Sequence, residues 1–262
     1  MWLSVVLDRF LSVLNALLGL SPASGWSFAV QASAQTLFFM AQWTEYHTHV
    51  LPTALGPVGV TEVQYTLIVG CLLSCFFPES CNAALAGPAM DESVLPMRVA
   101  IAVMVILGNI LSSLAFMLAV LNAPETKEPF KAILQLVAVT TIAVGSIFGF
   151  SDATYLGYAR QLSLATGFLL THLTNKMIVF SMAQQDFGGL IKQWIVLVYL
   201  GVMAATHSIA ESEEQLYAAM CVLLGLMGLN YIGWAAPTIL HISNALEINI
   251  FRINSEPKDK QS

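Results

Sequence analysis

Long runs of apolar residues dominate this chain from Val99 onward and decide what it can fold into. A helix that crosses a bilayer needs about 20 mostly apolar residues, because the hydrocarbon core is about 30 Å thick and a helix rises about 1.5 Å per residue. Such runs, the fourth of them short, lie at Val99–Leu121, Ala132–Phe150, Leu162–Ala183, Trp194–Thr206 and Leu216–Ala236, and the last continues toward Leu246. The pattern predicts membrane-spanning helices.

The composition supports a membrane environment for the whole chain. Of the 262 residues, 57% are hydrophobic and 10% are charged, whereas about a quarter are charged in ordinary soluble domains. The mean hydropathy is +0.74. With so little charge available to cover an apolar surface, we expect an integral membrane protein.

Three weaker segments precede these runs. Phe28–Trp43 carries glutamines at positions 31, 35 and 42, Tyr65–Phe77 extends back through "VTEVQ", and Met1–Leu20 contains Asp8 and Arg9. Counting all segments, we predict an all-α polytopic membrane bundle of about eight transmembrane helices. We expect a single transmembrane helical domain over residues 1–250 and a polar C-terminal tail over residues 251–262.

The distribution of charge predicts an orientation and excludes one class of partner. Lys127, Lys131 and Lys192 fall on the same expected face as the C-terminal tail, whereas the acidic turn at residues 211–215 falls on the opposite face. This asymmetry fits the positive-inside rule. The 10 basic residues are too few and too scattered for a nucleic-acid interface.

The stretch "QWTEYHTHV", residues 42–50, concentrates polar chemistry in an apolar chain. His47 and His49 could bind zinc, but a zinc site needs three or four protein ligands, and only Glu45 lies nearby in the sequence. We therefore expect no metal site. We interpret the stretch as a helix end and a loop at the lipid headgroups, with Trp43 and Tyr46 as interface anchors.

Two further positions are candidates for a polar pocket. Glu62 stands at an expected membrane boundary, where it either begins a helix or faces a polar headgroup. Asn175 and Lys176 fall inside an apolar run, where a lysine either snorkels to the nearer face or serves a function. The expected anionic partner of Lys176 is Glu62 or a phosphate.

Several short blocks together resemble a known enzyme family. "QWTEY", then "VTEVQ" with Glu62 and Gln64, then "LTNKMIVFSM" with Asn175 and Lys176, then "INIFRI" occur in an order and spacing similar to the choline- and ethanolaminephosphotransferase branch of the CDP-alcohol phosphotransferases. The resemblance spans about Trp26 to Asn254. It implies a relic lipid or headgroup site made of Trp43, Tyr46, Glu62, Gln64, Asn175 and Lys176.

The catalytic motif of that family is missing from the chain. Members of the family transfer a phosphoalcohol to diacylglycerol with divalent metal held by aspartates of D-G-x-x-A-R-x8-G-x3-D-x3-D, because pyrophosphate cleavage needs bridging cations and a carboxylate base. This chain has five aspartates and no D-G dipeptide. The resemblance therefore implies a truncated fold without a cofactor, and magnesium only where the motif is supplied elsewhere.

Three functions stay open on the sequence. The favoured one is a catalytically inactive structural or accessory subunit of a larger membrane complex, with other membrane subunits and phospholipid as partners. A mitochondrial respiratory assembly in the inner membrane is one host, whereas the resemblance implies the endoplasmic reticulum or Golgi. The second is part of an active phosphotransferase whose aspartates lie on a missing N-terminus or a partner chain. The third is a module that still holds a phospholipid headgroup.

Overall fold

The computed structural model of the chain describes residues 25–52, 54–55, 58–59, 69, 97–126, 128–151, 158–209 and 212–245. The helices expected at Met1–Leu20 and Tyr65–Phe77 fall almost entirely outside these residues. Glu62, Gln64 and the tail at 251–262 also lie outside them.

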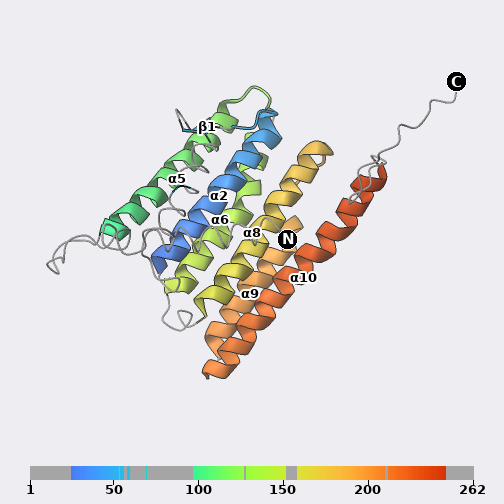
Figure 1. The fold of residues 1–262 in the computed structure, drawn as a ribbon. Coiled ribbons are helices and arrows are strands. Elements are labelled where there is room, and N and C mark those ends of the chain that lie inside the picture. Colours follow the sequence, from blue (N-terminus) through green and yellow to red (C-terminus); the bar gives the residue numbers. More distant parts are fainter. Residues whose placement is uncertain are drawn as a thin grey trace.

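The described residues form an all-helical bundle (Figure 1). One two-residue antiparallel pairing, between β1 (Ala54–Leu55) and β2 (Val58–Gly59), accompanies the helices. The helical elements are α2 (Gly25–Thr48), α5 (Met97–Asn122), α6 (Pro129–Ser151), α8 (Ala159–Met182), the 3₁₀ helix η1 (Leu190–Gln193), α9 (Trp194–Ile209) and α10 (Glu213–Ala245).

The expected helices are confirmed in this part of the chain, with one correction at the end of α2. We predicted a helix to Trp43 and then a loop, but α2 continues to Thr48. The hydroxyls of Thr44 and Thr48 donate to the carbonyls of Met40 and Thr44, four residues earlier, at 2.9 and 2.8 Å. His49 ends the helix with a φ of 57°, the left-handed conformation common just after a helix.

Two described helices are long and apolar enough to cross a bilayer, over Ala102–Asn122 and Glu213–Ala245. Pro129–Gly145 and Trp194–Thr206 are apolar but shorter. α2 and α8 carry most of the buried amides, hydroxyls and imidazole, which lower their hydropathy. The count of about eight spans stays a prediction.

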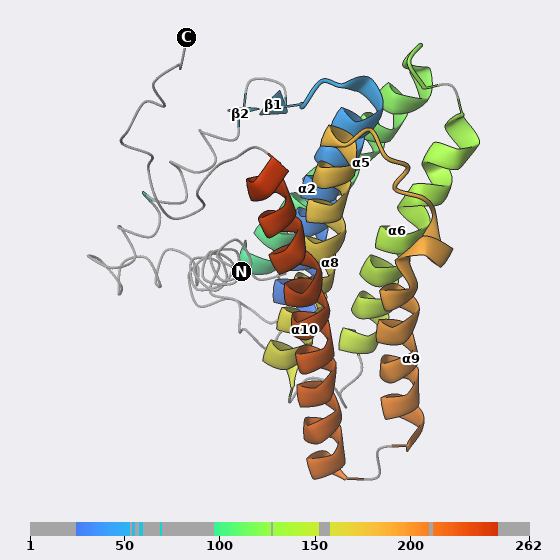
Figure 2. The ribbon, with the colours of Figure 1, turned by 90° about the vertical axis from the view of Figure 1, so that its right-hand side faces the viewer.

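Helices α2, α5, α8 and α10 run in one direction, and α6 and α9 run in the other (Figures 1 and 2). We call residues 183–193, which link α8 to α9, the connector, and the end of the bundle at which they lie the connector end. At the opposite end, the Tyr158 hydroxyl donates to the backbone carbonyl of Glu213 at 2.7 Å. Lys131 and Lys192 lie together at the connector end, as the loop charges predicted.

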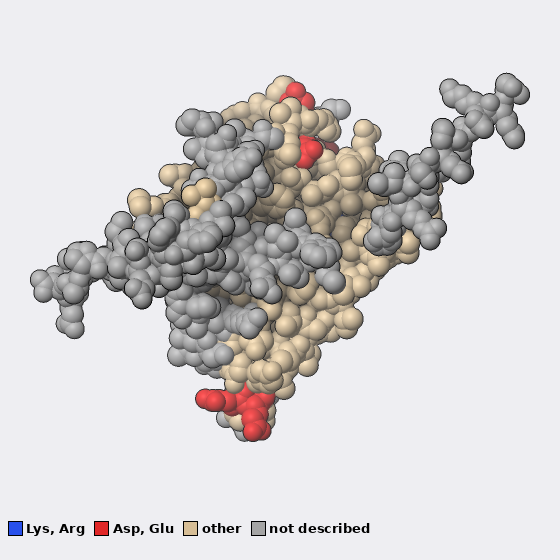
Figure 3. Space-filling model, viewed as in Figure 1, with Lys and Arg blue, Asp and Glu red and all other residues tan. Residues whose placement is uncertain are grey.

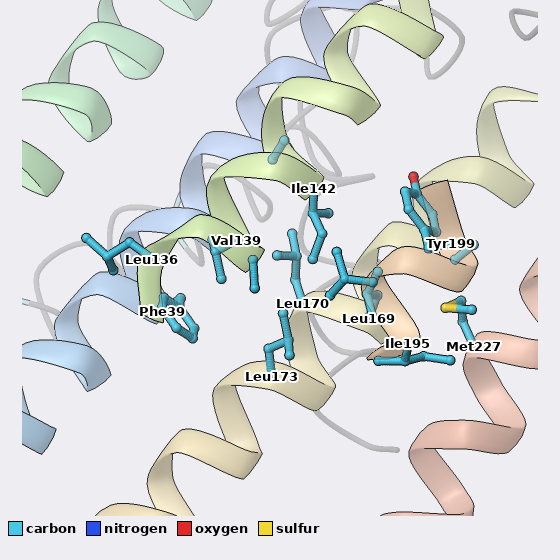
Figure 4. Close-up of a cluster of buried hydrophobic side chains, with 14 of the residues drawn as sticks. Phe39, Leu136, Val139, Ile142, Leu169, Leu170, Leu173, Ile195, Tyr199 and Met227 are labelled. Atoms are coloured by element: carbon cyan, nitrogen blue, oxygen red, sulfur yellow. The ribbon is translucent and has the colours of Figure 1, made fainter. Parts of the chain in front are cut away.

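α2 and α8 are the central helices of the described bundle. α2 packs against α5, α6 and α8, whereas α8 packs against α2, α6 and α10. α9 joins α6 and α10. Their shared core contains Phe39 of α2, Ile142 of α6, Leu170 and Leu173 of α8 and Tyr199 of α9 (Figure 4).

The bundle buries polar side chains among its apolar core, and its outer faces expose large apolar side chains. The buried polar residues on the central helices are Gln31, Gln35, Gln42, Thr44, Thr166, Thr171, His172 and Thr174. The outer faces of α5 and α10 expose many large apolar side chains, for example Leu111 at 66% and Leu229 at 70%. On the face shown in Figure 3, acidic side chains gather at two opposite ends, and the described surface between them carries no charge.

The helices α6 and α9 approach each other closely at Gly145. A Cβ on Gly145 would lie 2.9 Å from Cδ2 of Leu200, whereas a Cβ on Gly108 would meet no described heavy atom within 4 Å. We predict that Gly145→Leu lowers the free energy of unfolding by about 1–3 kcal/mol through overpacking. Gly108→Leu should leave it unchanged or raise it. Thermal unfolding of both variants in one detergent checks this, and equal midpoints would contradict it.

Candidate functional site

One amide at the connector end joins α2 to α6. Oε1 of Gln135 accepts a hydrogen bond from Nε1 of Trp43 at 3.2 Å and lies 2.9 Å from Nε2 of His47. Because an amide oxygen only accepts, His47 donates from Nε2. Trp43 is fully buried and Gln135 is 2% exposed. The expectation that Trp43 anchors the helix at a membrane interface is therefore wrong, because its indole lies in the protein core.

Tyr46 of α2 forms two hydrogen bonds with the connector. Its hydroxyl donates to the carbonyl of Gln185 at 2.8 Å and accepts from the backbone N–H of Phe187 at 3.3 Å. The buried ring of Phe187 packs against Phe39 and Phe180, with ring centroids 6.1 and 6.3 Å away. The connector is thus held by backbone hydrogen bonds on its polar side and by aromatic packing on its apolar side.

The connector turns sharply at Gly188, whose φ is 73°. The positive φ favours glycine, and a Cβ there would lie 2.2 Å from Cδ of Lys192, so that this exposed side chain would have to move. The turn brings Lys192 Nζ within 3.0 Å of Oδ2 of Asp186, and Lys131 Nζ lies 3.6 Å from the same oxygen. The hydrogen bond from Lys192 holds the pKa of the Asp186 carboxyl below its ordinary value of 3.8.

Lys176 has a different environment from these two lysines. Its Nζ donates to Oε1 of Gln193 at 3.0 Å and lies 5.6 Å from the centroid of the Phe180 ring. No carboxylate of the described residues lies within ion-pair distance of it. The amide of Gln193 is held at its other end, because Nε2 donates to the carbonyl of Phe187 at 3.0 Å.

Asn175 points to another helix. Its Nδ2 donates to the Tyr231 hydroxyl of α10 at 2.9 Å. Adjacent residues on a helix project about 100° apart, so neighbours in sequence need not share a pocket. One turn earlier, the buried His172 packs edge-on against Trp234 with ring centroids 5.1 Å apart, and its Nδ1 has no hydrogen-bond partner among the described residues.

The structure thus brings three of the six predicted site residues to one end of the bundle and links two of them, Tyr46 and Lys176. Trp43, Tyr46 and Lys176 lie at the connector end, where Phe187 and Gln193 link Tyr46 to Lys176. Asn175 is turned away toward α10. Glu62 and Gln64 lie outside the described residues, so the predicted pairing of Glu62 with Lys176 stays a prediction.

The sequence reading missed Gln135, Gln193 and Asp186. Gln135 is a single amide inside the apolar run "AILQLVAV", and a lone polar residue in such a run is a usable signal. Gln193 and Asp186 lie in the link between two runs, where nothing in the sequence marks them.

The described residues contain no group of three or more His, Cys, Asp or Glu side chains that could hold a metal ion. His47 directs its Nε2 to Gln135, and His49 lies exposed just beyond the helix end.

Searches with the whole chain find no match to a protein-family model and none to a curated protein sequence. The resemblance to the CDP-alcohol phosphotransferases therefore rests on the short blocks alone.

We predict that Gln135→Leu destabilises the connector end. The substitution would leave Trp43 Nε1 and His47 Nε2 without their shared acceptor, and a single buried unpaired group costs about 1–3 kcal/mol. Gln161→Leu is the matched control, because its half-buried amide has no described hydrogen-bond partner. Chemical unfolding followed by tryptophan fluorescence should show a loss only for Gln135→Leu, and similar curves for both variants would refute the role of Gln135.

We predict a small pH-dependent contribution from Asp186. A carboxyl whose pKa is lower in the folded state stabilises the fold above its unfolded pKa, and this is lost as the pH falls through the lowered value. Because the three paired side chains are 40–59% exposed, Asp186→Asn should cost less than about 1 kcal/mol near pH 7.

The difference between wild type and Asp186→Asn should disappear well below pH 3.8. Thermal unfolding over a pH series measures it, with Glu125→Gln, an exposed acid outside the described ion pairs, as the control. A difference that persists in strong acid would exclude the ion pairs as its cause.

Proposed function

We propose that this chain is an integral membrane protein with a single transmembrane domain of about eight helices. The observation that carries the proposal is the distribution of polarity: amides, hydroxyls and an imidazole lie inside, and large apolar side chains lie on the outer faces of α5 and α10. The surface helices of a soluble bundle instead turn charged and polar side chains outward. The two helices long enough to cross a bilayer support the same environment.

We further propose that it serves as a non-catalytic accessory subunit of a larger membrane complex. α10 supports this proposal, because Gly225, Gly228 and Gly233 lie along a helix that exposes Leu229 and Ile232. A Cβ at any of these glycines would meet no described heavy atom within 4 Å. Small residues allow transmembrane helices of different subunits to approach closely, so this face suits a partner helix.

The absence of a D-G dipeptide from the sequence supports a non-catalytic role. In this proposal the chain descends from the CDP-alcohol phosphotransferases and keeps their bundle without the metal-binding aspartates. The proposed location is the mitochondrial inner membrane, with a respiratory assembly as host, and the partners are other membrane subunits and phospholipid.

Native electrophoresis of gently solubilised membranes tests the subunit role. We predict that the tagged chain migrates at a size far above a monomer or dimer. Gly228→Leu should release part of it to the monomer position, because the new side chain would block a close partner helix without a clash inside the chain. Gly108→Leu, on α5, is the control and should stay in the complex.

Two results would overturn this function. One is migration of the wild-type chain only as a monomer or dimer. The other is release of CMP when the purified chain is incubated with CDP-choline or CDP-ethanolamine, diacylglycerol and magnesium, which would support the enzymatic alternative.

A further inference from the structure

Lys176 is the one described lysine without a carboxylate partner. Lys131 and Lys192 both contact Asp186, at 3.6 and 3.0 Å, and are half exposed or more. Lys176 is partly buried among helices and offers its charge to a neutral amide and an aromatic ring. A membrane-embedded ammonium is costly unless an anion compensates it, and the described residues supply no carboxylate at ion-pair distance.

The depth of Lys176 suits a ligand that enters from the connector end. It lies six residues before α8 ends at Met182, which is about 9 Å along the helix axis. Its Nζ reaches Gln193, the last residue of η1 and of the link between α8 and α9, so the charged end of the side chain lies against this link. At this distance from the end of a spanning helix, a lysine ammonium lies within reach of a lipid headgroup phosphate.

The Lys176 ammonium is also held in position by one acceptor, which uses only one of its three N–H donors. The Gln193 amide is fixed by its hydrogen bond to Phe187, which presents Oε1 to Lys176. Gln193 is 1% exposed, so this acceptor is part of the core. An ammonium has three N–H donors, and Gln193 takes one of them. A phosphate supplies both the missing negative charge and several acceptor oxygens.

We infer that Lys176 binds a phosphate group, supplied by an anionic phospholipid that lies against α8 beside the connector. The inference rests on the proposed membrane location and names the ligand chemistry of one residue of the predicted relic site. It assigns phosphate binding to Lys176 and not to Asn175, because the Asn175 amide donates a hydrogen bond to the Tyr231 hydroxyl. Basic positions between membrane helices near one face are typical binding points for anionic headgroups.

The test measures lipid retention by native mass spectrometry of the full chain. Wild-type protein is purified in mild detergent and offered equal amounts of phosphatidylglycerol and phosphatidylcholine. We expect wild type to retain phosphatidylglycerol preferentially. Lys176→Gln should reduce that preference about fivefold, the loss expected for one lysine near a charged headgroup.

Two further variants distinguish a binding role from a structural one. Lys176→Arg keeps the charge and should retain the preference. Lys131→Gln, an exposed lysine at the same end, should leave it almost unchanged. A loss as large for Lys131→Gln as for Lys176→Gln would show a diffuse surface effect and overturn the inference. An unchanged preference in Lys176→Gln, in protein with wild-type helicity, would also overturn it.

A second arm separates the two sources of phosphate. Inorganic phosphate is added to delipidated wild-type protein, and the thermal midpoint is compared with that after adding phosphatidylglycerol. Stabilisation by the lipid alone supports a headgroup. Equal stabilisation by inorganic phosphate, absent in Lys176→Gln, would overturn the lipid source. Neither result depends on the size of the complex on native gels, so the inference can fail while the accessory role stands.

Discussion

The polar contacts between α2 and α8 are the constraint on which the rest of the described structure depends. In an apolar exterior, buried amides and hydroxyls must find partners inside the bundle. The Ser163 hydroxyl of α8 donates a hydrogen bond to the Gln31 amide oxygen of α2. Gly167 of α8 leaves room for the Gln35 side chain of α2, since a Cβ at Gly167 would lie 3.3 Å from the Gln35 amide nitrogen. The close approach of α2 and α8 at this point lets the other helices pack around these two.

The same rule explains the connector end. The backbone between α8 and α9 leaves its helical ladder for several residues, and its N–H and C=O groups need other partners. Tyr46 and Gln193 supply them through Gln185 and Phe187. These side-chain to backbone bonds thereby fix α2 to the link between α8 and α9, which is distant from it in sequence. The position of Lys176 follows from this, because its acceptor belongs to the connector.

The sequence was informative where a property is local. Apolar runs are sufficient to locate α5, α6, α8, α9 and α10 to within a few residues, because hydrophobicity and helix length are encoded position by position. The end of α2 was placed too early, because Glu45 and His47 resemble loop residues until Gln135 and the connector are present to satisfy them. Trp43 was misplaced for the same reason: its type suits an interface, but its neighbour Gln135 lies 92 residues away.

The predicted site illustrates how a resemblance and a structure constrain each other. The blocks "QWTEY" and "LTNKMIVFSM" are more than 120 residues apart, yet the C-terminal halves of α2 and α8 bring both to the connector end. A shared headgroup pocket would require this convergence, and the proposed origin stays a proposal. The convergence is selective, because Tyr46 and Lys176 turn toward the connector and Asn175 turns toward α10. A surviving headgroup site at this end would therefore be built on Lys176 and its amide, and Asn175 would act in helix packing.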